Sequence, residues 1–189
     1  MRPVELSELK NIAEYELERP AWRPKVLALK ERRRIDVGNH VTFLFENRET
    51  VRYQIQEMMR IEHMVKAEEI AHEAATYNEL VPKPGELSAT LLIAYPSEEE
   101  RDVMLRKLLG LENHVWVEVA GAARSAARFD TRQIATDRIS SVQYVKFPLT
   151  EEQIRRWKDG AKIVVDHKSY RAERALSKME LEELAGDLS

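Results

Sequence analysis

The sequence predicts an α+β fold, in which a mostly antiparallel sheet packs against helices and one long helix lies in the N-terminal half. Two observations predict it. Helix-spaced apolar residues among many charges run through the first part of the chain, whereas apolar runs bounded by turn residues follow after about residue 86. A length of 189 residues is that of one domain. We therefore expect a single domain over 1–189, with a helical portion over about 1–80, a sheet-rich portion over about 86–176, and a C-terminal helix or tail over 177–189.

The composition excludes several kinds of chemistry. The chain has no cysteine, which excludes disulfides, thiolate nucleophiles and the usual iron–sulfur ligands. A net charge of -3 argues against a surface built throughout for nucleic acid. No window approaches the roughly 20 apolar residues of a membrane span, and the N-terminal segment has no continuous apolar h-region, so no signal peptide is expected. A soluble, cytoplasmic protein is the expectation.

The first elements are expected to be short. Ser7 is a candidate cap for a helix that Pro20 ends, and one or two helical turns follow over 26–32. Gly38-Asn39 then predicts a tight turn between two strands. The second of these strands alternates, with Val41, Phe43 and Phe45 on one side.

The longest helix is expected over 48–77, with Asn47 as its N-cap. Its early apolar residues share one sector, but beyond Met64 the apolar face rotates by about a quarter turn. His63 lies on this apolar side, which predicts a packed histidine. Pro82, Pro84 and Gly85 make the next segment a loop.

Two later segments, beginning near residues 88 and 140, share the order strand, cap, helix, glycine, strand. Capping boxes are predicted at Ser97 with Glu100 and at Thr150 with Gln153. Gly110 and Gly160 are expected to end the two helices. The segment 170–177 is expected to be a strand paired with the strand over 162–167, and the segment 120–140 receives no assignment.

The predicted long helix contains a Glu-x-x-His pair at Glu69 and His72. Together with Glu62 and Glu73 it is a candidate metal site, because this spacing holds metal in carboxylate-bridged di-iron proteins. Such a site needs a second pair, and the chain has none. We therefore favour a solvated, charge-paired helix face and predict no cofactor, with a bound metal as the lesser hypothesis.

Basic residues concentrate in segment 19–34. Arg32, Arg33 and Arg34 are candidates, with Arg48, for binding an anion or an acidic partner. Trp22 is the only aromatic residue nearby, so the segment lacks the stacking surface of single-strand binders. A solvated basic patch is the simpler interpretation.

The junction motif Glu46, Asn47, Arg48 and Glu49 lies where a strand meets a helix N-terminus, a place that favours anions. The alternative is local. Asn47 caps the helix, Glu49 complements its dipole, and Arg48 pairs with Glu46 or Glu49.

Two stretches, "LFENRETVRYQIQEMMRIE" (44–62) and "YNELVPKPGELSATLLIAY" (77–95), carry a resemblance. With "LALKERRR" they resemble the bacterial family catalogued as domain of unknown function 3501, over nearly the whole chain. The resemblance supplies no catalytic residues. It implies an accessory role around redox metabolism, with a protein partner of a rubrerythrin-like or iron–sulfur system.

The leading function hypothesis is thus a non-enzymatic accessory or interaction protein with no membrane association. One alternative is an enzyme that binds a metal or small ligand through Glu and His groups of the long helix. Another is anion or nucleic-acid binding through segment 19–34. Self-association is left open.

Overall fold

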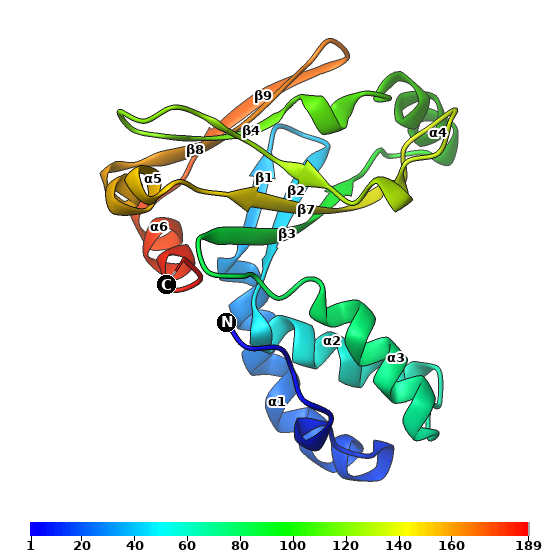
Figure 1. The fold of residues 1–189 in the computed structure, drawn as a ribbon. Coiled ribbons are helices and arrows are strands. Elements are labelled where there is room, and N and C mark those ends of the chain that lie inside the picture. Colours follow the sequence, from blue (N-terminus) through cyan, green and yellow to red (C-terminus); the bar gives the residue numbers. More distant parts are fainter. Residues whose placement is uncertain (189) are drawn as a thin grey trace.

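The computed structural model describes residues 1–188. Two antiparallel sheets lie one above the other, and the N-terminal helices project from below the first sheet (Figure 1). The helices are α1 (Ile12–Arg32), α2 (Arg48–Ile61), α3 (Ala67–Asn78), α4 (Glu98–Lys107), α5 (Glu151–Arg156) and α6 (Lys178–Ala185). The strands are β1 (Arg34–Val37), β2 (Val41–Glu46), β3 (Glu86–Ile93), β4 (Val115–Val119), β5 (Ser125–Ala126), β6 (Arg128–Phe129), β7 (Val142–Pro148), β8 (Ala161–His167) and β9 (Tyr170–Ala175). This is the predicted α+β class.

The two sheets meet at both edges. The first has the order β1-β2-β3-β7-β6 and the second the order β5-β4-β8-β9. Segment 125–129 passes from one sheet to the other at the buried Ala127. At the opposite side, the Tyr170 hydroxyl at the start of β9 donates to the Val37 carbonyl at 2.6 Å. A Cβ at Gly38 would collide with that hydroxyl, so the turn between β1 and β2 requires glycine here.

The main core fills the space between the sheets. The predicted alternation of β2 is confirmed, because Val41, Phe43 and Phe45 are all buried in this core. Phe147 of β7 packs against both phenylalanine rings. Burying each such side chain contributes about 2 kcal/mol. The residues of β2 and β7 that alternate with these buried ones lie on the opposite face of the first sheet, toward the helices.

Residues 1–33 and 47–81 form a helical unit with a small core of its own. Two side-chain amides hold the N-terminal segment of this unit. Each amide forms hydrogen bonds with both the backbone N–H and the backbone carbonyl of a single residue. Gln56 accepts from the Lys10 amide at 2.6 Å and donates to its carbonyl at 3.1 Å. Asn78 does the same for Val4, at 2.7 and 2.9 Å.

The expected end of the first helix at Pro20 is wrong. Asn11, not Ser7, caps α1, and the helix continues through Pro20 and Pro24. A proline inside a helix costs about 3 kcal/mol. Side-chain contacts with α2 offset that cost, because Arg19 binds Glu57 through two hydrogen bonds and Trp22 donates to Glu49.

The expected continuous helix over 48–77 is also wrong. α2 ends at Ile61, His63 has φ +52°, and α3 begins at Ala67. Thus α1 is the long helix of the N-terminal half, and α2 and α3 fold back on one another (Figure 1). The rotated apolar face marks this break, because each helix turns its own face to the shared core. His63 is exposed at the break rather than packed.

The two later capped helices were predicted with partial success. Thr150 and Gln153 form the reciprocal capping box, whereas Ser97 accepts from the Glu100 amide without a return bond. Gly110 and Gly160 both have positive φ. β9 pairs with β8 as expected, and α6 docks on the core through Leu181 and Leu184. Within residues 1–188, no helix combines the length and apolar character needed to cross a membrane.

Candidate functional site: a cleft between α3 and β7

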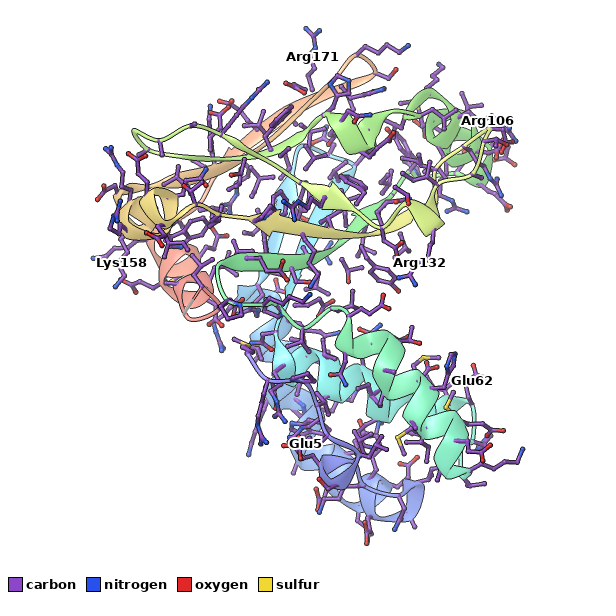
Figure 2. All side chains as sticks on the ribbon, in the orientation of Figure 1. Glu5, Glu62, Arg106, Arg132, Lys158 and Arg171 are labelled. Carbon is purple, nitrogen blue, oxygen red and sulfur yellow. The ribbon has the colours of Figure 1, made fainter. Side chains whose placement is uncertain are left out.

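A cleft of about 460 Å³ lies between the end of α3 and the β6–β7 edge of the first sheet. Figure 2 shows Arg132 between these two parts of the molecule. The cleft is lined by Glu73, Thr76, Tyr77, Glu79, Leu80, Arg128, Phe129, Asp130, Arg132, Tyr144 and Lys146. Its size is within the range of ligand sites in proteins.

The alternation of β7 places two of these side chains. Gln143, Val145 and Phe147 face the core between the sheets. Tyr144 and Lys146 therefore face the opposite side, toward α3. Tyr77 reaches the same space from the last turn of α3, and Leu80 follows it in the turn after the helix. The cleft thus combines two phenols with apolar walls.

Burial and negative charge act together on the two phenols. Burial raises the pKa of Tyr77, and Glu73 and Glu46 raise it further against a hydrogen bond from Gln54. The pKa of Tyr144 is raised first by burial and then by Tyr77, Glu46, Asp130 and Glu73. Both phenols stay protonated at neutral pH, because burial and the nearby carboxylates oppose their ionisation.

Glu46, one of these carboxylates, lies behind the cleft. Its side chain is 1% exposed, and it accepts hydrogen bonds from the hydroxyls of Thr50 and Thr90. Thr90 lies opposite Tyr144 in the β3–β7 register, so the carboxylate is one strand away from that phenol. The predicted junction motif therefore lies next to the cleft rather than forming a site of its own.

Most charges around the cleft are paired. Arg132 bridges Glu79 at the end of α3 and Asp130 beside β6. Lys146 binds Glu86 at 3.2 Å and the Val81 carbonyl at 3.3 Å, and burial lowers its pKa.

Two charged side chains of the cleft differ from the others. Across the part of the chain that the structure describes, the half-buried Glu73 and the exposed Arg128 form no ion pair and no side-chain hydrogen bond. A half-buried carboxylate without a hydrogen-bond donor is the group in this cleft that a donor from a ligand would stabilise most.

The residues of the predicted metal site are not brought together. Glu62 lies in the turn after α2, at the right-hand edge of the helical unit in Figure 2. Glu69 pairs with Lys66, His72 is exposed, and Glu73 faces the cleft. Among the described residues, no group of three or more His, Asp or Glu side chains is placed to hold a metal ion.

The predicted anion-binding arginines have partners inside the molecule. Arg33 is 1% exposed and binds Glu183 and Asp187 near the C-terminus. Arg32 also pairs with Glu183, and Arg34 with Asp36. The contacts of Arg32 and Arg33 join the end of α1 to α6 and the residues after it, whereas the pair of Arg34 with Asp36 lies within β1.

The local interpretation of the junction motif is correct for its cap and wrong for its ion pair. Asn47 accepts from the amides of Glu49 and Thr50, both at 3.0 Å. Arg48 pairs with Glu8 of the N-terminal segment instead of Glu46 or Glu49.

Sequence reasoning missed Tyr77, Tyr144, Lys146 and Arg128. Alternation in segment 142–148 was the available signal, since it puts Tyr144 and Lys146 on the face away from the core. Arg128 lies in the segment that received no assignment, and no pattern joins Tyr77 to residues more than 50 positions away.

One of the stretches that carry the family resemblance, residues 44–62, supplies side chains that make contacts within the helical unit. Gln54 bonds Tyr77, Gln56 holds Lys10, and Glu57 accepts from Tyr15 and Arg19. These contacts join α2 to the N-terminal segment, to α1 and to Tyr77, which lines the cleft.

Comparisons with known proteins agree with this resemblance. A crystal structure of a novel protein of unknown function from Burkholderia pseudomallei superposes with a TM-score of 0.93 at 31% identity, covering 100% of both chains. No curated protein matches the chain. The family described as protein of unknown function (DUF3501) matches residues 3–188. The chain belongs to this family.

Proposed function

We propose that this chain is a non-enzymatic interaction protein, which binds a protein partner through the cleft between α3 and β7. The observation that carries the proposal is the cleft itself. It has the volume of a ligand site, aromatic and apolar walls, and a carboxylate, Glu73, that no described residue satisfies. Such a place suits an inserted side chain of another protein.

Contacts inside the chain favour binding over catalysis. Lys146 has the lowered pKa expected of a reactive amine, but Glu86 and the Val81 carbonyl hold its ammonium group. Glu69 and His72, the pair that suggested a metal enzyme, lie outside the cleft lining. Arg32, Arg33 and Arg34, suggested for nucleic acid, are occupied by carboxylates.

We further propose a bacterial, cytoplasmic setting, with a partner from a rubrerythrin-like or iron–sulfur redox system. This follows from the role that the family resemblance implies. The absence of cysteine in the chain is consistent with it, because any iron–sulfur cluster would then belong to the partner.

Filling the cleft tests the proposal. Thr76 and His72 are both exposed and lie one turn apart on α3, but only Thr76 lines the cleft. The tagged full chain and its Thr76→Trp and His72→Trp variants are used to capture proteins from lysates of cells whose genome encodes this protein. We expect the wild type and His72→Trp to retain an identified redox protein that Thr76→Trp loses. Equal capture by all three proteins, or capture of no redox protein, would contradict the proposal.

A further inference from the structure

The charges and walls of the cleft indicate what kind of group enters it. We propose that the cleft receives a lysine or arginine side chain of the partner, with Glu73 as the carboxylate that binds its cationic head. This inference rests on the proposed function and specifies the chemistry of the group that is bound.

The charged side chains of the cleft favour a cationic group. Arg132 is held by Glu79 and Asp130, and Lys146 by Glu86. These pairs leave Glu73 as the one carboxylate of the cleft without a partner in the described residues. A cationic donor is the group that best satisfies a half-buried carboxylate, because a charge-assisted hydrogen bond is about twice as strong as a neutral one.

The aromatic surroundings of Glu73 also favour a cation. Tyr77 lies one helical turn after it, and Tyr144 faces it from β7, close enough that Glu73 affects the ionisation of both phenols. The faces of tyrosine rings attract cations, and their hydroxyls can accept hydrogen bonds. The buried Glu46 behind them adds negative potential without its own access to the cleft.

The apolar lining of the cleft suits the stem of a lysine or arginine side chain. Leu80 and Phe129 line the same cleft as the tyrosines, from its two sides. Lysine and arginine have long apolar stems that pack on such surfaces while the charged head reaches a polar partner. A glutamate or aspartate side chain would meet Arg128 on the β6 side but would be repelled near Glu73.

The test uses three probes with the same backbone: N-acetyl-lysine, N-acetyl-norleucine and N-acetyl-glutamate methylamides. Binding to the full chain is followed by NMR through the ring signals of labelled tyrosine, with assignments from Tyr77→Phe and Tyr144→Phe. The variants are Glu73→Gln in the cleft and Glu68→Gln, an exposed residue of the same helix that does not line it.

We expect the lysine probe to bind about tenfold more tightly than the norleucine probe, and the glutamate probe to bind most weakly. Glu73→Gln should remove the preference for lysine and leave norleucine binding unchanged, whereas Glu68→Gln should bind like the wild type. Binding of norleucine without a preference for lysine would overturn the inference and leave the proposed function standing. Tighter binding of the glutamate probe, or no shift with any probe, would also overturn it. Capture by the Thr76→Trp and His72→Trp pair decides the proposed function separately.

Discussion

Arg33 and Asp187 form an ion pair in which both side chains are almost completely buried, at 1% and 2% exposure. The guanidinium also donates to the carbonyls of Phe45 and Glu46 and to Glu183. The pair thus joins the end of α1, the end of β2 and the C-terminal residues after α6. An arginine expected to bind anions on the surface is instead buried, and it holds the C-terminal residues to the ends of α1 and β2.

Removing this arginine should strongly destabilise the fold. Arg33→Ala leaves Asp187 and Glu183 without their main cationic partner in a dry environment, so we expect a loss of about 3–5 kcal/mol in the free energy of unfolding. Urea unfolding measures it. Arg34→Ala is the matched control, because Arg34 and Asp36 are exposed and their pair contributes at most about 1 kcal/mol. Equal losses in the two variants would contradict this account.

The amide of Asn78 should hold the N-terminal segment. Asn78→Ala removes both of its hydrogen bonds to the Val4 backbone, and we expect a loss of about 1–3 kcal/mol with faster hydrogen exchange at Val4. Hydrogen-exchange mass spectrometry on peptides from the first ten residues measures the effect. In Asn113→Ala, which loses only a side-chain bond to its neighbour Glu112, exchange in this segment should stay unchanged.

Glu57 should make the stability depend on acid. Arg19 and then Tyr15 lower its pKa from 4.5 to about 2 against the effect of burial. A carboxylate with a lowered pKa in the folded state stabilises the protein fully above its unfolded pKa. That contribution is lost as the pH falls from about 4.5 toward 2. The contribution at neutral pH is on the order of 2 kcal/mol, since both partners are mostly shielded from solvent.

Urea unfolding of the wild type and Glu57→Gln across this pH range checks the linkage. The difference between the two proteins should be largest above pH 4.5 and should shrink toward pH 2. A difference that stays constant with pH would show that Glu57 acts through packing rather than through its charge.

The cleft phenols should report on Glu73. Because Glu73 raises the pKa of both Tyr77 and Tyr144, Glu73→Gln should lower both values. NMR titration of ring-labelled tyrosine, assigned with Tyr77→Phe and Tyr144→Phe, measures them. Glu68→Gln should leave the two titrations unchanged. If Glu73→Gln also had no effect, the carboxylate would not face the phenols.

Local signals predicted much of the fold. The caps at Asn47 and Thr150, the turn at Gly38 and the alternation of β2 depend on neighbouring residues, and the structure contains all of them. The path of α1 could not be predicted, because Pro20 has the same local preference whether or not distant side chains such as Glu57 hold the helix. The break at His63 was visible only as a rotated apolar face.

The cleft could be predicted even less well. Its two walls come from α3 and from segments 128–132 and 144–146, and only the folded chain brings them together. Candidate residues chosen by type, such as Arg33 or Glu69, proved to be paired inside the molecule. Glu73 is distinguished by its lack of an ion-pair or hydrogen-bond partner among the described residues, and such contacts can be seen only in the folded structure.

Site-specific photo-crosslinking in living cells tests the central claim most directly. A small photoreactive amino acid, an aliphatic diazirine too slender to fill the cleft, replaces either Thr76, which lines the cleft, or His72, which is also exposed one turn earlier on α3. We expect a defined covalent adduct with a partner protein from position 76 and none from position 72. Equal adducts from both positions, or an adduct from position 72 alone, would contradict binding in the cleft.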